Sequence, residues 1–228
     1  MKPAPKHLLT VIIVLSFAGS TGACSSRPDN DPQTGAQAPD TSNADLPIIL
    51  AFGDSLTFGS GVDRKLSYPS QLQDELDRRG YAYRVVNSGI SGDTTSGGVA
   101  RLNTALALEP DIVILELGGN DGLRGVPVEV ARDNLRTMIA SFKEIGSRVI
   151  LAGMTLPLNY GPDYIREFES IYVDLSEELD VVRIPFFLEG LIEEYERYMQ
   201  PDGIHPTGEG YTIVVATVVN TIEPFLLN

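Results

Sequence analysis

The sequence predicts an α/β fold, in which a parallel β-sheet lies between layers of helices. Short apolar runs alternate along the chain with longer segments whose apolar residues recur at helical spacing. Right-handed crossovers between parallel strands place a helix on a face of the sheet each time, so this alternation favours a sheet packed between helices. Glycine and small polar residues follow several of the apolar runs, where strands of such a sheet end at the ligand-binding edge.

The first predicted strand is the apolar run Ile48–Phe52, which is typical of a strand buried on both faces of a parallel sheet. Gly53 then allows the backbone to turn where a side chain would clash. Asp54 and Ser55 are residue types that begin helices by accepting hydrogen bonds from free N–H groups. These two residues either cap a helix and do nothing more, or they place a reactive hydroxyl at the edge where ligands bind.

The later elements follow from the same two signals. Apolar runs predict strands, and segments with apolar residues on one face predict helices, two of which stop at Gly80 and Gly146. The expected strands are 81–86, 112–117 (interpreted as fully apolar), 149–153 and 181–184, and the expected helices are 68–79, 94–108, 128–145, 163–179 and 207–226. The order of the strands in the sheet stays open.

The N-terminus is predicted to be a signal peptide over residues 1–23. A positively charged start precedes the apolar run 8–18, which is too short to span a bilayer. Small residues then lead to Cys24, so the segment resembles the cleavage site of a bacterial lipoprotein, in which this cysteine is lipidated. Thr21 stands where such sites usually carry leucine, and the alternative is ordinary signal cleavage without a lipid.

Residues 24–46 are rich in Pro, Asp, Asn, Ser and Gly and predict a flexible tether, which places the folded domain at 47–228. A tether behind a lipid anchor would hold a domain off a membrane surface. Ser26 stands where an aspartate would mark retention in the inner membrane of many Gram-negative bacteria. By analogy we expect an exported, periplasmic protein that is lipid-anchored to the outer membrane of a Gram-negative bacterium.

The composition argues against several classes of partner. With a net charge of −14 and a sequence pI near 4.5, the chain does not suit nucleic acid, whose phosphates require a basic patch. One cysteine and two histidines do not make a zinc site at the usual spacings. We expect no metal, no cofactor, a monomeric protein, and contact with a membrane only through Cys24.

Polar residues and glycines follow the first three predicted strands. Ser55 follows the first strand, Gly92 lies in the turn after the second, and Asn120 follows the third, so all three are expected at one edge of the sheet. Near the C-terminus, Asp202 precedes His205 by three residues in a Pro- and Gly-rich loop, which is a poor place for a core histidine. Because the only other histidine lies in the predicted signal peptide, a histidine-activated serine would have to use His205.

The motifs GDSL, SGD, GGND and DGIH, in that order, resemble those of the GDSL or SGNH hydrolase family, which is named for a Ser, a Gly, an Asn and a His. The match runs over about 48–211. The strings LELGGNDGLRG, LPLNYGPDY and MQPDGIHPTGEG are similar to its bacterial branch of multifunctional thioesterases, which also act as lysophospholipases and arylesterases. The resemblance implies a flavodoxin-like three-layer α/β/α sandwich with five parallel strands and the hydrolysis of acyl esters or thioesters.

The chemistry of these residue types points to the same reaction. A serine hydroxyl is a weak nucleophile and needs a base within hydrogen-bond reach. His205 is the candidate base for Ser55, and Asp202 is expected to orient the imidazole and stabilise its charged form. The resemblance implies that the oxyanion hole consists of the backbone N–H groups of Ser55 and Gly92 and the side-chain amide of Asn120.

The segment 155–162 after the fourth predicted strand is apolar, contains prolines and leaves the sheet at the same edge. The resemblance implies that this loop moves on binding and favours longer acyl chains. The expected substrate-binding residues are Leu156, Leu158, Asn159, Tyr160 and, after the fifth strand, Phe187. The alternative is that Leu156 and Leu158 only pack the loop onto the domain.

Three other functions stay open, namely a carbohydrate acetylesterase of the same fold, a non-catalytic flavodoxin-like domain that binds FMN, and a structural surface lipoprotein. Ser91 is a rival nucleophile because GISGD nearly matches the GxSxG elbow of α/β-hydrolases, but Asp93 replaces the last glycine. Asp54, Asp93 and Asp121 follow predicted strands and are expected to cap or brace turns.

Overall fold

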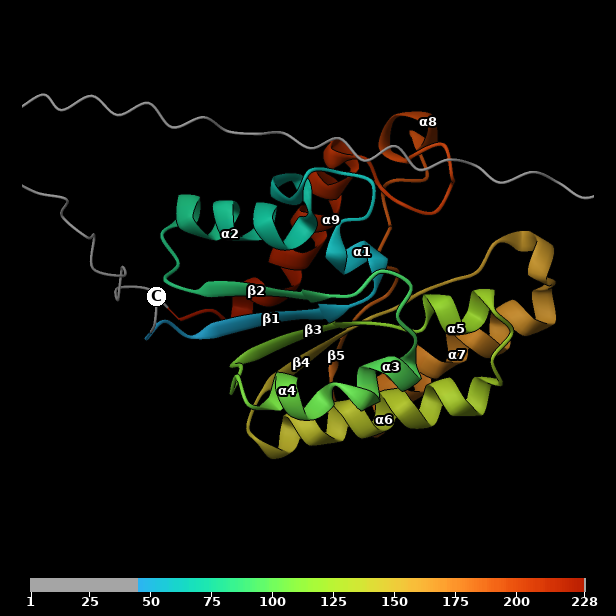
Figure 1. Ribbon diagram of the computed structural model, residues 1–228, viewed down its shortest axis with the longest axis horizontal. Coiled ribbons are helices and arrows are strands. Elements are labelled where there is room, and N and C mark those ends of the chain that lie inside the picture. The colour runs from blue at the N-terminus through green and yellow to red at the C-terminus, as the bar shows by residue number, and fades with distance from the viewer. Residues whose placement is uncertain (1–44, 228) are drawn as a thin grey trace, which may run out of the picture. The chain divides into compact units, whose positions relative to one another are not determined.

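The computed structural model describes residues 45–227, which form a five-stranded parallel sheet with helices on both faces (Figure 1). The strand order is β2-β1-β3-β4-β5, which is the flavodoxin-like order. The strands are β1 (Ile48–Gly53), β2 (Arg84–Gly89), β3 (Ile112–Glu116), β4 (Arg148–Ala152) and β5 (Val182–Ile184). The predicted signal peptide, Cys24 and most of the predicted tether lie outside the described residues.

The helices form two layers. Helices α2 and α9 pack together on one face of the sheet, and α3, α4, α6 and α7 cover the other (Figure 1). The α-helices are α1 (Ser55–Phe58), α2 (Tyr68–Arg79), α3 (Thr95–Ala100), α4 (Leu102–Leu106), α5 (Gly119–Leu123), α6 (Val128–Glu144), α7 (Pro162–Glu178), α8 (Tyr195–Tyr198) and α9 (Gly208–Ile222). Short 3-10 helices are η2 (Arg64–Leu66), η3 (Leu158–Tyr160) and η4 (Glu223–Phe225). The predicted three-layer α/β/α sandwich is confirmed.

Strand β1 lies at the centre of the core. Its residues Ile49–Phe52 are fully buried, and the strand pairs with β2 on one side and β3 on the other. Burying one large apolar side chain contributes about 1.5–3 kcal/mol. Phe52 also meets Phe142 of α6 edge-to-face, with the ring centroids 5.7 Å apart. The turn that follows β1 is therefore supported by a fully buried part of the core.

The connections change direction at β1. The chain leaves β1 for β2 on one side and later returns to β3 on the other side of β1. Ligands bind outside the carboxyl ends of the strands at such a switch point. Because Ser55 follows β1 and Asn120 follows β3, the topology alone brings these two residues to one crevice.

The second strand begins three residues later than the sequence predicts. Gly80 adopts a left-handed backbone with φ of +82°, and the N–H of Tyr81 donates to Leu76 O at 3.0 Å, so Tyr81 belongs to the C-terminal cap of α2. Pairing with the neighbouring segment starts at Arg84, whose N–H donates to Pro47 O at 2.9 Å. The helix cap therefore extends into the segment that the apolar pattern assigned to a strand.

Two predicted helices are shorter than expected, and one predicted strand is not fully apolar. The helix expected at 94–108 is broken at Arg101, whose φ of −107° and ψ of 7° separate α3 from α4. The last helix ends at Ile222 because Pro224 has no N–H to continue it. The expectation that 112–117 is fully apolar is wrong, since Glu116 lies in β3 and is fully buried.

Candidate active site

Ser55 is the first residue of α1, directly beyond the carboxyl end of β1. Asp54 caps this helix, and its carboxylate accepts a hydrogen bond from Leu56 N–H at 3.0 Å. A Cβ at Gly53 would lie 2.0 Å from Thr57 Oγ1, so only glycine lets the helix start this close to the strand. The backbone N–H of Ser55 stands in the first turn of α1, where a helix offers no internal acceptor.

The structure brings Ser55, His205 and Asp202 into one hydrogen-bonded chain. His205 Nε2 lies 2.8 Å from Ser55 Oγ, although the two residues are 150 positions apart. His205 Nδ1 lies 2.7 Å from Asp202 Oδ2 on the other side of the ring. With the carboxylate accepting the Nδ1 proton, the neutral ring presents a bare Nε2 to the serine hydroxyl.

The charge on Asp202 is held by local hydrogen bonds. Partial burial acts to raise the pKa of Asp202, but hydrogen bonds from the His205 ring and from the N–H groups of Ile204 and His205 outweigh it and hold that pKa at about 2. The two backbone bonds measure 2.9 Å from Ile204 N and 3.1 Å from His205 N. Asp202 is therefore ionised at neutral pH and stabilises a protonated His205.

The loop that carries His205 is tied to the loop after α1 through Gln200. The side-chain amide of Gln200 donates to Ser60 O and to Pro206 O, both at 2.8 Å. The backbone N–H of Gln200 donates to His205 O at 2.7 Å, and Met199 pairs with Pro206 in an antiparallel bridge. These contacts set the position of the imidazole relative to Ser55.

The three residues expected to form the oxyanion hole lie in the turns after β1, β2 and β3. Gly92 has a left-handed backbone, with φ of +78°, and its carbonyl accepts from Arg124 Nη2 at 2.9 Å. The amide of Asn120 donates to Asp54 Oδ2 at 2.9 Å. The Asn120 side chain is therefore held by the residue that precedes Ser55.

Sequence reasoning missed a buried carboxyl group beneath this site. Glu116 Oε2 accepts from Thr57 Oγ1 at 2.8 Å and from Asp54 N–H at 3.3 Å. Burial raises the pKa of Asp54 to about 6, and burial together with the Asp54 charge raises the pKa of Glu116 well above its usual range. The signal in the sequence was a glutamate inside a run otherwise typical of a buried strand.

The other aspartates brace turns, as expected. Asp93 forms an ion pair with Arg101 at 2.8 Å, and Asp121 accepts from Thr95 N–H at 2.8 Å and from its hydroxyl at 2.6 Å. The rival nucleophile Ser91 is exposed, and its Oγ lies 3.0 Å from Ser60 Oγ. The imidazole of His205 is engaged by Ser55 instead.

The five residues expected to bind substrate differ in exposure. Leu158 is 90% exposed and Asn159 is also exposed, whereas Tyr160 is half-buried and donates through its hydroxyl to Leu123 O at 2.8 Å. Leu156 packs in the core, as the alternative interpretation expected for it. Phe187 is fully buried and meets Tyr68 edge-to-face, so the structure does not support its placement in an open groove.

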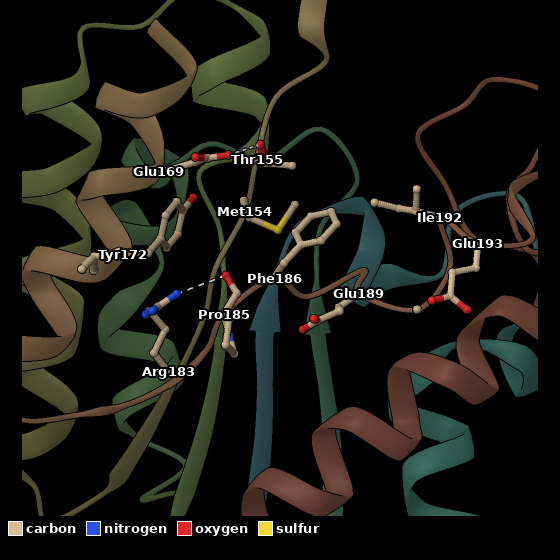
Figure 2. Close-up of a pocket in the computed structure, with 12 residues that line it drawn as sticks. Met154, Thr155, Glu169, Tyr172, Arg183, Pro185, Phe186, Glu189, Ile192 and Glu193 are labelled. Atoms are coloured by element: carbon tan, nitrogen blue, oxygen red, sulfur yellow. Dashed lines mark hydrogen bonds between the residues drawn. The ribbon is translucent and has the colours of Figure 1, made fainter. Parts of the chain in front are cut away.

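A cavity of about 560 Å³ opens beside the carboxyl ends of β4 and β5 (Figure 2). Met154, Phe186 and Ile192 give it apolar walls, as Figure 2 shows. Its remaining lining residues are Thr155, Glu169, Tyr172, Val173, Arg183, Pro185, Glu189, Gly190 and Glu193. Phe186 therefore lines an accessible hollow, in contrast to its neighbour Phe187.

Within residues 45–227, no group of three or more His, Cys, Asp or Glu side chains is arranged to hold a metal ion. In the same part of the chain, no helix is both long and apolar enough to cross a bilayer.

Comparison with known proteins agrees with this geometry. Residues 51–213 match the GDSL-like Lipase/Acylhydrolase family. The chain is 41% identical over 187 residues to Esterase TesA of Pseudomonas aeruginosa, covering 82% of this chain and 92% of that protein. It is 44% identical over 179 residues to Arylesterase of Vibrio mimicus (78% and 89% covered) and 35% identical over 179 residues to Thioesterase 1/protease 1/lysophospholipase L1 of Escherichia coli strain K12 (78% and 84% covered).

A solved structure of TesA superposes with a TM-score of 0.74 at 41% sequence identity, covering 78% of this chain and 98% of that one. The matched span 51–213 includes Ser55, Gly92, Asn120, Asp202 and His205. The chain belongs to the GDSL-like lipase/acylhydrolase family.

Proposed function

We propose that the protein is a serine hydrolase that cleaves ester or thioester bonds of acyl substrates through an acyl-enzyme. The observation that carries the proposal is the unbroken hydrogen-bonded chain from Ser55 Oγ through the His205 ring to Asp202. One chain supplies every residue of this arrangement, so the proposed reaction does not require a second copy.

Acylation begins when Ser55 Oγ attacks the carbonyl carbon of the substrate and His205 Nε2 takes the hydroxyl proton. The imidazolium that forms is stabilised by the ionised Asp202. The tetrahedral intermediate then collapses, and the proton on Nε2 passes to the leaving alcohol or thiol. A water molecule, deprotonated by the same nitrogen, then attacks the acyl-enzyme. When this second tetrahedral intermediate collapses, the bond to Ser55 Oγ breaks, the acid is released, and the proton on Nε2 returns to Ser55 Oγ.

The negative oxygen of each tetrahedral intermediate requires donors that are already in place. Ser55 N–H at the start of α1, Gly92 N–H and the Asn120 amide are the proposed donors. Removing one such donor costs about 2.7–4 kcal/mol of transition-state stabilisation in enzymes of this kind. The three donors come from three different turns, so the sheet topology positions them together.

Reaction with a fluorophosphonate probe tests the nucleophile. Wild-type protein should gain the mass of one phosphonyl group on the peptide that contains Ser55, and Ser55→Ala should not react. Ser91→Ala is the matched control, because it removes the rival hydroxyl and should leave labelling unchanged. Label on Ser91, or an active Ser55→Ala enzyme, would contradict the proposal, and a yellow purified protein would favour the FMN-binding alternative.

For substrate class, the activities for which the relatives are named support acyl esters and thioesters, including aryl esters and lysophospholipids. A carbohydrate acetylesterase would hydrolyse acetyl esters fastest and would lose activity as the acyl chain becomes longer. Rates of hydrolysis along a series of p-nitrophenyl esters and acyl thioesters separate the two: a rise from acetyl to medium chains supports the proposal.

We also propose that Cys24 is lipidated and holds the enzyme at the periplasmic side of the outer membrane. The support is the sequence of the N-terminal segment, with its apolar run, its small residues before Cys24 and the serines that follow.

A further inference from the structure

Two carboxyl groups lie directly beneath the candidate nucleophile. Glu116 is fully buried at the end of β3, and Asp54, the residue before Ser55, is 2% exposed. Glu116 Oε2 accepts from Thr57 Oγ1 and Asp54 N–H. The other oxygen, Oε1, is buried and has no hydrogen-bond partner among residues 45–227.

Glu116 Oε2 accepts from the backbone N–H of Asp54 at 3.3 Å, so the two buried carboxyl groups are close enough for their charges to interact. Two ionised carboxylates repel at this distance, and a hydrogen bond between them requires one proton. Burial raises the pKa of both groups, and the Asp54 charge raises that of Glu116 further, whereas Asp54 keeps stabilising bonds from Leu56 N–H and the Asn120 amide. The proton therefore belongs on Glu116.

The surroundings favour this protonated state. The titratable side chains that act on the pair are Tyr68 from α2, Tyr172 from α7, Tyr211 from α9 and, on Asp54, His205 from the loop before α9. Burial raises the pKa of each of these tyrosines, so all three stay neutral. If Glu116 were ionised, its buried charge would be surrounded by neutral hydroxyls and by the like charge of Asp54. Burying a charge without a compensating positive charge costs free energy.

Asp54 connects Glu116 to the proposed oxyanion hole. Its Oδ2 accepts from Asn120 Nδ2 at 2.9 Å, and its Oδ1 accepts from Leu56 N–H at 3.0 Å. We propose that Glu116 is a positioning residue that is protonated in the working enzyme, where its acid proton holds the Asp54 carboxylate and Asp54 in turn aims the Asn120 amide at the oxyanion. This inference rests on the proposed function, in which Asn120 donates to the transition state.

The deciding comparison is between Glu116→Gln and Glu116→Ala. Glutamine keeps the shape and the donor of a protonated glutamic acid, so Glu116→Gln should keep kcat within about threefold at pH 7. Alanine removes the donor, so Glu116→Ala should lower kcat and kcat/KM together by about 10- to 100-fold with little change in KM, because the loss occurs in the transition state. Adding Asn120→Ala should then cost little more, because both changes disable the same donor.

Two readouts distinguish positioning from simple structural support. Wild-type kcat should fall at alkaline pH as Glu116 ionises, and Glu116→Gln should lack this fall. Infrared spectra at pH 7 should show the carbonyl stretch of a protonated carboxylic acid in wild type and in Ser55→Ala, and this band should vanish in Glu116→Gln. Ser147→Ala is the matched control, because Ser147 is also buried, bonds Pro110 O and lies at the opposite edge of the sheet.

Absence of that band in wild type, its survival in Glu116→Gln, or additive losses from Glu116→Ala and Asn120→Ala would overturn the inference. The infrared measurement does not depend on turnover. If Ser55→Ala stayed active, the proposed function would fail, while the protonation of Glu116 would still be decided by the band. If Glu116→Ala does not fold, Glu116→Gln and the infrared band carry the test alone.

Discussion

The position of the candidate nucleophile depends on Gly53. It ends β1, and a Cβ there would lie 2.0 Å from Thr57 Oγ1 and 2.5 Å from Glu116 Oε2. Both of those atoms belong to the buried network that joins Asp54 to β3. A single methyl group therefore cannot be added without moving the start of α1 and, with it, Ser55.

We expect Gly53→Ala to lower kcat/KM by about 100-fold or more and to destabilise the fold by about 1–3 kcal/mol, since overpacking a buried site forces backbone shifts. Esterase assays and thermal unfolding measure the two effects. Gly80→Ala is the control, because Gly80 has a φ of +82° but open space around its Cβ position. It should cost about 1–2 kcal/mol of stability and leave activity per folded molecule unchanged. Equal activity losses in both variants would remove the steric explanation.

Ser55→Ala and His205→Ala should each reduce kcat by about four to six orders of magnitude, because nucleophile and base act as one unit. The double variant should be little worse than either single variant. Circular dichroism should confirm that the fold is intact, and Asp202→Asn should have a similar or somewhat smaller effect. Strictly additive losses would separate Ser55 from His205 and refute a shared role.

The buried Glu116 also makes stability depend on pH. Its folded-state pKa is raised above the ordinary value of 4.5, so its contribution to stability is fully present below about pH 4.5 and is lost as the pH rises from there toward the folded-state pKa. Glu116→Gln cannot ionise and lacks this loss. The melting temperature of Glu116→Gln relative to wild type should therefore be higher at pH 8 than at pH 5. A difference that is constant across this range would mean that Glu116 is ionised in the folded protein.

At the scale of elements, side-chain hydrogen bonds hold together the turns that form the site. Arg101, at the break between α3 and α4, donates to Gly53 O and to Ser88 O, both at 2.9 Å, and lies 3.8 Å over the ring of Phe52. It also pairs with Asp93, the residue after Gly92. The interruption of the predicted helix thus places a guanidinium where it joins the carboxyl ends of β1 and β2.

The loop that includes η3 is connected to the site through α5. The Tyr160 hydroxyl bonds Leu123 O of α5, the helix that also carries Asn120, and Leu158 in the same loop is 90% exposed. An exposed leucine on a loop beside the site is available to an acyl chain. Each methylene that it covers is worth about 0.8 kcal/mol.

We therefore expect kcat/KM to rise from acetyl toward medium-chain esters in wild type, and Leu158→Asp to flatten this rise without abolishing hydrolysis of acetyl esters. Ile145→Asp is the control, because it adds the same charge at an exposed apolar residue at the opposite edge of the sheet. An unchanged chain-length profile in Leu158→Asp would exclude this leucine from the substrate site.

At the scale of the whole molecule, the described domain contains the complete candidate site. The hydrogen bonds that order Ser55, His205, Asp202 and Asn120 all come from residues between Asp54 and His205. All of these contacts lie within residues 45–227, and we expect the domain and the N-terminal segment to have separate roles.

A chain that begins at residue 45 should consequently keep wild-type kcat/KM in solution. In bacterial cells, Cys24→Ala should move the enzyme from the membrane fraction to the soluble fraction, while the matched variant Ser26→Ala should stay with the membrane. Mass spectrometry of the mature N-terminus identifies the acyl groups. A soluble wild-type protein without acyl mass would refute the anchor and leave the enzyme proposal intact.

Sequence by itself determined the fold class, most helices and the residues of the Ser55–His205–Asp202 chain, because apolar periodicity, glycine stops and short motifs are local signals. The strand order, the pairing that starts β2 at Arg84 and the burial of Glu116 and Phe187 were decided only by the tertiary structure. These features depend on contacts between segments far apart in the chain, as between Glu116 and Thr57, which lie 59 positions apart. Local pattern cannot tell whether a glutamate in an apolar run faces water or a second carboxyl group, since packing against other elements sets both its burial and its charge.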